Sequence, residues 1–314
     1  MTDTPRTVPV QTPKPLLIRA IWREARPHQW VKNAFVVAPL VFAGPELLRD
    51  HEVDASLLIR VVAGFVAFCL ASSATYFMND IHDLEADRGH PVKRMRPIAA
   101  GLLPIATAWR WFWGLLATAG LLSLVSGPFF LACVLAYFLL NAAYSKGLKH
   151  VAYVDALVIS GGFLLRVVAG GAAAQVSLSG WLIACMVLLS MFLALGKRKH
   201  ELRTTGGSHR ASLGLYRESH LNLALAALAV ATTATYLGYT LDPGTAARFH
   251  THLLPWTVPF PLFGLWRFMR LMDARDSVHS PTERMLRDLP FTVNLASWSV
   301  IVVVVIYGLL GAEP

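Results

Sequence analysis

The sequence predicts an all-α membrane protein with nine transmembrane helices. Of its 314 residues, 55% are hydrophobic and only 15% are charged, whereas soluble domains carry about 25% charged residues. Mean hydropathy is +0.51, and the apolar residues are gathered in runs of roughly the 17 to 25 residues that a helix needs to cross a bilayer. These observations exclude a soluble globular domain.

The first part of the chain is polar and precedes every apolar run. Residues 1–15 are rich in proline and polar side chains, which predicts a disordered arm. No apolar segment follows directly, so a cleavable signal peptide is not expected. Residues 16–33 then predict a basic amphipathic segment that lies on the membrane surface.

Nine apolar segments follow, and with the surface segment they form one predicted transmembrane domain over residues 16–314. Their expected limits are 34–49, 57–78, 105–124, 127–144, 151–173, 179–196, 221–241, 252–272 and 289–311. Several are interrupted by glycine or proline, so their ends are expected to shift by a few residues.

Positive charge is distributed unevenly between the two sets of loops. Most of the 28 Lys and Arg residues lie in the segments 1–33, 79–104, 145–150, 197–220 and 267–288. The opposite loops contain only Arg49 and Arg248. The positive-inside rule therefore places the N-terminus and the long polar loops in the cytoplasm. Topology also explains the net charge of +9, so no nucleic-acid partner is expected.

The end of the second span predicts a metal site. With a helix over residues 79–87, the side chains of Asn79, Asp80, Asp83 and Asp87 fall within about 100° of one another. Carboxylates so close repel each other, and a hard divalent cation would remove that cost. Oxygen ligands favour Mg²⁺ or Mn²⁺, and protein-bound Mg²⁺ usually bridges carboxylates to substrate phosphates. The alternative is a solvated acidic helix end.

A basic segment follows the carboxylates directly. Lys93, Arg94 and Arg96 lie shortly after Asp87, between two prolines that end regular helix. A loop of this kind, facing a metal site, can hold phosphate oxygens and stabilise a leaving diphosphate. The alternative is that these residues are ordinary cytoplasmic-side charges.

Two ionisable residues lie inside the fifth predicted span. Asp155 and Arg166 are eleven residues apart, so they face the same way with about 16 Å of helix rise between them. Charged groups inside a membrane are candidates for function. They either line one water-filled cavity or pair separately with neighbouring helices.

The segment from Asn79 to Gly101 has the pattern N-D-x-x-D-x-x-x-D followed by H-P-x-K-x-x-R-P-I-x-x-G. In a chain with nine predicted spans, it resembles the first motif of the UbiA superfamily of intramembrane prenyltransferases. The resemblance covers about residues 20–311. It implies a nine-helix bundle with an active site near the cytoplasmic face, and it implies that Asn79, Asp80, Asp83 and Asp87 bind Mg²⁺, the three aspartates being catalytic.

The sequence departs from this superfamily at a second position. Its quinone and haem prenyltransferases carry another acidic motif, D-x-x-x-D, in the loop after the sixth span. Residues 195–203 read LGKRKHELR instead, with Lys197 and Arg198 in place of acids and Glu201 retained. This departure argues against two metal clusters and for an additional phosphate held by cations.

Four further segments resemble one branch of the superfamily: RPHQWVKN (26–33), YSKGLKH (144–150), LLRVVAGG (164–171) and GKRKHEL (196–202). Members of this branch transfer 5-phosphoribose from phosphoribosyl diphosphate (PRPP) to a polyprenyl phosphate such as decaprenyl phosphate, a step toward cell-wall arabinan. The resemblance implies the same substrates here, with Mg²⁺ or Mn²⁺, in a bacterial inner (plasma) membrane. A homo-oligomer is compatible with the sequence.

The side chains expected to contact substrate come from several loops and spans. They are Lys32, Asn33, Tyr76, Lys93, Arg94, Arg96, Tyr144, Lys149, Asp155, Arg166, Lys197, Arg198 and Glu201.

Two other functions stay open. One is a UbiA-type prenyltransferase that joins a polyprenyl diphosphate to an aromatic acceptor for quinone or haem synthesis, and the missing second acidic motif weighs against it. The other is a transporter or lipid-binding protein that uses the acidic face as an ion site. The sequence shows no clear inverted repeat with paired broken helices, which weighs against a transporter.

Overall fold

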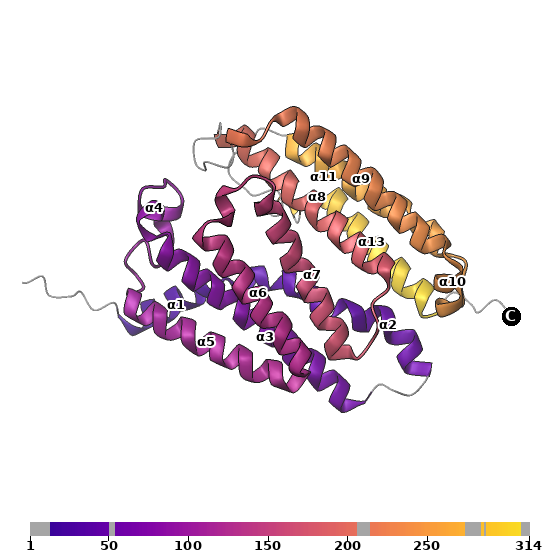
Figure 1. Cartoon of the computed structure of the whole chain (residues 1–314), viewed down its shortest axis with the longest axis horizontal. Helices are drawn as coiled ribbons and strands as arrows, with labels where there is room; N and C mark the ends of the chain where they lie inside the picture. The colour runs from indigo at the N-terminus through magenta and orange to yellow at the C-terminus, as the bar shows by residue number, and fades with distance from the viewer. Residues whose placement is uncertain (1–12, 50–53, 206–213, 274–283, 286, 309–314) are drawn as a thin grey trace, which may run out of the picture.

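The structure is a computed structural model that describes residues 13–49, 54–205, 214–273, 284–285 and 287–308. Every regular element in these residues is a helix, and the long helices lie side by side in a bundle (Figure 1). The predicted all-α class is therefore confirmed. Most of the predicted N-terminal arm, residues 1–12, and the last residues of the ninth predicted span lie outside the described residues.

Seven helices of the described chain are long and apolar enough to cross a membrane. They are α3 (Ala55–His82), α5 (Ile105–Ser126), α6 (Pro128–Lys146), α7 (Val154–Ala174), α8 (Gly180–Thr205), α9 (Glu218–Leu241) and α13 (Leu289–Ile306). They correspond to seven of the nine predicted spans. The largest difference is at α8, which continues through the segment LGKRKHELR that was expected to be a loop. Lys, Arg, Glu and Leu all favour helix, so the segment has no reason to unwind.

The other two predicted spans are each divided between a 3₁₀ helix and a shorter α-helix. The first consists of η1 (Pro27–Val36) and α2 (Ala38–Arg49), the second of η5 (Leu254–Thr257) and α11 (Pro259–Asp273). Proline is frequent in both, and it removes a backbone donor and obstructs the preceding turn. The predicted surface segment, residues 16–33, is divided between α1 (Lys14–Ala25) and η1. Since Asn33 of η1 is 0% exposed, η1 belongs to the bundle, and α1 is the part that can lie on the surface.

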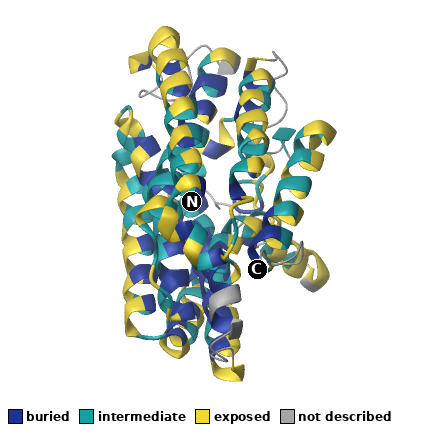
Figure 2. Cartoon of the chain, turned by 90° about the vertical axis from the view of Figure 1, so that its right-hand side faces the viewer, coloured by how far each residue is buried: buried dark blue, intermediate teal, exposed yellow. Residues whose placement is uncertain are grey.

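Exposed residues follow the outer faces of the long helices (Figure 2), and many of them are large apolar residues. Leu223 and Val230 of α9, for example, are 72% and 70% exposed. In water, an apolar surface of this extent would cause copies of the protein to associate. In a bilayer it meets lipid chains, as expected for a multi-pass membrane protein.

The helix α3 organises the half of the bundle that contains the predicted metal site. It packs against α1, η1, α5, α6 and α7, and small residues such as Ala67, Ala71 and Ala74 are fully buried along it. Close approach also holds η1 against α7, because a Cβ atom on Gly170 would overlap the carbonyl oxygen of Val36. Only glycine leaves room for this contact, which sets the position of η1 along α7.

Candidate active site

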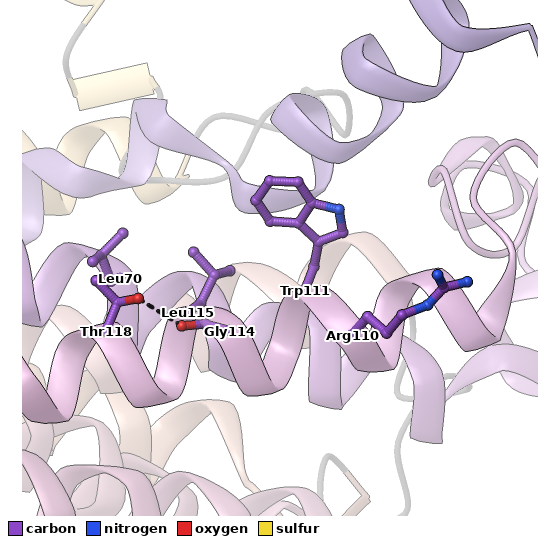
Figure 3. A pocket seen from close by; sticks show the side chains of 6 residues that line it. All are labelled: Leu70, Arg110, Trp111, Gly114, Leu115 and Thr118. Atoms are coloured by element: carbon purple, nitrogen blue, oxygen red, sulfur yellow. Dashed lines mark hydrogen bonds between the residues drawn. The ribbon is translucent and has the colours of Figure 1, made fainter.

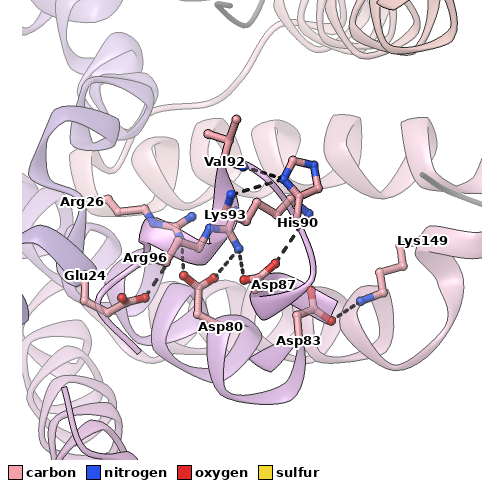
Figure 4. A network of polar contacts seen from close by, with 10 residues as sticks. All are labelled: Glu24, Arg26, Asp80, Asp83, Asp87, His90, Val92, Lys93, Arg96 and Lys149. Atoms are coloured by element: carbon pink, nitrogen blue, oxygen red, sulfur yellow. Dashed lines mark hydrogen bonds and ion pairs between the residues drawn. The ribbon is translucent and has the colours of Figure 1, made fainter. Parts of the chain in front are cut away.

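The predicted helix over residues 79–87 is interrupted, which changes how its carboxylates point. The helix α3 ends at His82 and α4 (Leu84–Arg88) begins after Asp83, whose backbone angles are φ −89° and ψ 9°. Asp80 and Asp87 point toward a common group of cations, whereas Asp83 points away from them (Figure 4). The prediction of one continuous acidic face is therefore wrong at Asp83. The break reduces the repulsion that three aligned carboxylates would suffer.

Each of the three aspartates has a basic partner. Arg96 bridges two of them, because its Nη1 donates to Asp80 Oδ1 at 3.0 Å and to Asp87 Oδ2 at 2.6 Å. Lys93 Nζ lies 3.7 Å from Asp87 Oδ1. Lys149 Nζ donates to Asp83 Oδ1 at 2.6 Å. The predicted basic loop, which contains η2 (Lys93–Met95), thus does face the carboxylates, although the side chain of Arg94 is exposed.

Two residues of this cluster were missing from the sequence prediction. Arg26, between α1 and η1, forms an ion pair with Asp80 and lies 4.8 Å from the centre of the Tyr76 ring. Its backbone is left-handed (φ 52°, ψ 56°), which costs a residue other than glycine about 1 kcal/mol or more. The segment RPHQWVKN contains Arg26. Hydropathy and spacing do not show that the chain turns between α1 and η1 in such a way that Arg26 points at α3.

Glu24 is the second missing residue. Its side chain is 0% exposed and lies 3.9 Å from Arg26 Nη2. Burial, and then the charge on Asp80, raise the pKa of Glu24 to about 9. Glu24 is therefore protonated at neutral pH and adds no negative charge to the cluster.

Arg166 is at the centre of a separate polar network, inside the bundle. Its Nε donates to Asn33 Oδ1 at 2.8 Å, and its Nη2 donates to the hydroxyls of Tyr137 at 3.1 Å and Ser72 at 3.2 Å. The guanidinium also lies 4.5 Å from the centre of the Tyr137 ring. Asn33 and Arg166 were both predicted as site residues, and the structure brings them together. Their contact with substrate stays a prediction.

Asp155 belongs to a third cluster, between α7 and α8. It lies 3.2 Å from Arg198 Nε, and neither side chain is exposed. Tyr216 OH donates to Asp155 Oδ1 at 2.6 Å, and Arg198 also pairs with Glu201. Of the two sequence interpretations of Asp155 and Arg166, these contacts favour separate pairing with neighbouring helices over one shared cavity.

The remaining predicted residues lie around these clusters. Lys32 on η1 and Tyr144 on α6 are both half-buried. Lys197 is 46% exposed, and its Nζ is 4.0 Å from Glu201 Oε1. Its neighbour Lys199 is buried and donates to Asp273 of α11 at 2.7 Å. The basic end of α8 is therefore largely neutralised by nearby acids.

Comparison with known proteins explains this combination of a helical bundle and an acidic cluster at the end of α3. The model of the UbiA prenyltransferase family matches residues 37–287. The chain belongs to the UbiA prenyltransferase family. Its membership confirms the resemblance that the motif at Asn79–Gly101 suggested.

Two curated relatives match nearly the whole chain. Decaprenyl-phosphate phosphoribosyltransferase from Corynebacterium glutamicum is 35% identical over 98% of this chain and 94% of the relative. The enzyme of the same name from Mycolicibacterium smegmatis is 36% identical, with coverage of 92% and 93%.

A solved structure shows the same fold. The structure of a UbiA homolog from Archaeoglobus fulgidus bound to DMAPP and Mg²⁺ matches with a TM-score of 0.68, over 92% of this chain and 99% of that one. Sequence identity between the two is 15%. The described helices therefore have the UbiA arrangement.

The acidic cluster offers suitable atoms for the Mg²⁺ ion found in that UbiA structure. Asn79 Oδ1 and Asp87 Oδ1 are buried oxygens without a hydrogen-bond donor, and oxygen atoms are the ligands that Mg²⁺ prefers. Within the described residues, however, no three acidic, histidine or cysteine side chains converge on one point as metal ligands. Basic side chains stand between the aspartates, so a metal ion must displace some of them.

A groove on the outside of the bundle is separate from all three clusters. It has a volume of about 380 Å³ and is lined by Leu70, Arg110, Trp111, Gly114, Leu115 and Thr118 of α3 and α5 (Figure 3). None of these residues belongs to the clusters described above. We therefore place the candidate active site at the acidic cluster and not at this groove.

Proposed function

We propose that the protein transfers 5-phosphoribose from PRPP to a polyprenyl phosphate, decaprenyl phosphate in the first instance, and releases diphosphate. The observation that carries this proposal is the carboxylate cluster at the end of α3, surrounded by basic side chains, in a chain whose α8 lacks the second D-x-x-x-D motif. The names of the 35–36% identical relatives support the same donor and acceptor. PRPP carries both a diphosphate and a separate 5-phosphate, which fits a site rich in cations.

In this proposal Asp80 and Asp87, with Asn79, would hold Mg²⁺, and Asp83 would join them on release from Lys149. The ion would supply charge neutralisation to the diphosphate. Arg96 and Lys93 lie beside these carboxylates and are placed to donate to the diphosphate oxygens as well. Such charge-assisted bonds stabilise the negative charge that develops as the bond between C1 and the diphosphate oxygen breaks.

The acceptor needs little chemical activation. A lipid phosphate is already anionic near neutral pH, so its oxygen can form the new bond to C1 without a strong general base. The displaced diphosphate leaves with both electrons of the broken bond. Rate enhancement then rests on positioning and electrostatic stabilisation.

We further infer that the chain crosses a bacterial plasma membrane nine times, with its N-terminus in the cytoplasm. The pair η1–α2 has 10 and 12 residues and can extend about 38 Å; the pair η5–α11 has 4 and 15 residues and can extend about 30 Å. Both reach across a hydrocarbon core of about 30 Å. Cysteine labelling from each side of the membrane, at exposed loop positions, tests this topology.

The reaction is tested directly with purified protein in detergent. One sample contains Mg²⁺, PRPP and decaprenyl phosphate, and a parallel sample contains a polyprenyl diphosphate with 4-hydroxybenzoate. Mass spectrometry of the lipids should find a phosphoribosyl lipid in the first sample only, and EDTA should abolish it. A prenylated aromatic product in the second sample would instead establish the prenyltransferase alternative.

One matched pair of variants links this activity to the acidic cluster. Asp80→Asn removes a carboxylate that is 3% exposed and is expected to abolish the phosphoribosyl product while the protein still folds. Glu85→Gln is the control, because Glu85 is 83% exposed and pairs with Arg88. Equal activity in both variants would disprove the assignment of the site.

A further inference from the structure

Asp80 receives two guanidinium groups from different parts of the chain. Arg96 comes from the loop that follows α4, and Arg26 comes from the corner between α1 and η1 (Figure 4). The two arginines differ in their other partners. Arg96 also bonds to Asp87 at 2.6 Å, whereas the second carboxyl group near Arg26 is that of Glu24, at 3.9 Å.

A metal ion and Arg26 compete for the same carboxylate. The Asp80 Oδ2 atom that Arg26 contacts is one of the oxygens that a divalent cation needs. When a metal ion binds Asp80 Oδ2 and the undonated Asp87 Oδ1, Arg96 keeps Asp87 Oδ2 as a partner at 2.6 Å, whereas Arg26 loses its one close carboxylate oxygen. The displaced guanidinium is then left in a largely buried position, where a charge without a close partner is costly.

Arg26 cannot move far from the site when it is displaced. Its backbone is fixed in the left-handed conformation at the helix corner, and the Tyr76 ring lies 4.8 Å from the guanidinium. Its side chain is 22% exposed, compared with 3% for Asp80, so it borders the open side of the cluster. A planar guanidinium in this place matches the geometry of phosphate oxygens.

We propose that Arg26 binds the diphosphate of the substrate, and that Asp80 holds Arg26 in position until a divalent cation takes over the carboxylate. The proposal rests on the function proposed above, because it requires a diphosphate that arrives with the metal ion. It assigns to the α1–η1 corner a direct part in substrate binding, and it predicts opposite effects on metal binding and diphosphate binding when Arg26 is removed.

The test compares purified wild-type protein with Arg26→Gln, Arg26→Lys and the control Arg23→Gln. Arg23 is an exposed residue about one turn earlier on α1. Binding of Mn²⁺ alone is followed by electron paramagnetic resonance, and binding of inorganic diphosphate and of PRPP is then measured in the presence of Mn²⁺. Thermal unfolding in detergent verifies that each variant is folded.

Arg26→Gln is expected to bind Mn²⁺ alone more tightly and to bind Mn²⁺–diphosphate roughly tenfold more weakly, which corresponds to about 1.4 kcal/mol. Arg26→Lys should fall between it and the wild type, and Arg23→Gln should match the wild type in both measurements. A purely structural role would weaken both ligands together, and that result would overturn the proposal. Unchanged diphosphate binding in Arg26→Gln, or none in the wild type, would overturn it too.

The two proposals can fail separately. If the wild type binds Mn²⁺–diphosphate but neither binds PRPP nor forms a phosphoribosyl lipid, the proposed function fails while the opposite shifts in Arg26→Gln still support the role of Arg26. If phosphoribosyl lipid forms normally and Arg26→Gln binds Mn²⁺–diphosphate like the wild type, the role of Arg26 fails alone.

Discussion

Replacing Asp155 by alanine removes one of the two carboxylates that neutralise Arg198. Both side chains of this ion pair are 0% exposed, with 3.2 Å between Arg198 Nε and Asp155 Oδ2. Removing one partner of a buried pair typically costs about 3–5 kcal/mol, because the other charge stays buried. Glu201 still pairs with Arg198, so we expect a loss near the lower limit, about 3 kcal/mol. Tyr216 also loses its acceptor, which adds about 1 kcal/mol.

The comparison that isolates the buried charge is the double variant Asp155→Leu with Arg198→Met. Apolar residues of similar size often replace a buried ion pair without loss of stability. We therefore expect the double variant to be more stable than Asp155→Ala, even though Tyr216 remains without its acceptor. The control is Lys197→Gln on the same helix, where an exposed pair is worth at most about 1 kcal/mol.

Stability is measured by equilibrium unfolding in mixed micelles of mild detergent and SDS, followed by the change in helical circular dichroism. A loss below about 1 kcal/mol in Asp155→Ala would refute the argument from buried charge. A double variant no more stable than the single one would also refute it. The same double variant also tests whether Arg198 binds substrate. If its KM for PRPP equals that of the wild type, Arg198 does not contact a phosphate group of PRPP.

Two further predictions concern how α1 and η1 pack against the rest of the bundle. The pKa of Glu24 is raised from its usual value of 4.5 to about 9 by burial and by the charge on Asp80, so its contribution to stability is complete below the unfolded pKa and decreases as the pH rises toward 9. Glu24→Gln should flatten the dependence of the unfolding midpoint between pH 5 and pH 9, and an unchanged dependence would contradict the assigned pKa. Gly170→Ala brings a Cβ atom into overlap with the carbonyl oxygen of Val36, so we expect a loss of about 1–3 kcal/mol from overpacking. The exposed Gly114, where an added Cβ atom would meet nothing within 4 Å, is the matched control, and equal effects would argue against close packing of η1 on α7.

The sequence predicted most strongly what depends on neighbouring residues along the chain. Hydropathy located seven membrane-spanning helices, because the apolar length of a span is a local property. It failed to show the division of η1–α2 and η5–α11, where proline interrupts an apolar run without much lowering its hydropathy. It also misplaced the end of α8, since charged residues that pair with Asp155 and Asp273 remain helical.

The candidate site was predicted only in part, because its geometry depends on contacts between distant segments. Asp80 and Asp87 were found from their spacing, and the basic loop was found from its position after them. Arg26 and Glu24 were missed because nothing in the local pattern shows that α1 turns back onto the end of α3. The direction of Asp83 was missed because it depends on the break after His82 and on a contact with Lys149, 66 residues away.

The charge balance of the acidic cluster bears on how substrate binds. Among the residues labelled in Figure 4, Arg26, Lys93, Arg96 and Lys149 carry four positive charges, against three negative charges on the aspartates. Glu24 is neutral at pH 7 because its pKa is about 9. A divalent cation alone would therefore add charge to a cluster that is already positive and partly buried, which is unfavourable. A diphosphate offsets this excess, so metal ion and diphosphate should bind together, and the cations that occupy the aspartates beforehand become the ligands of the diphosphate.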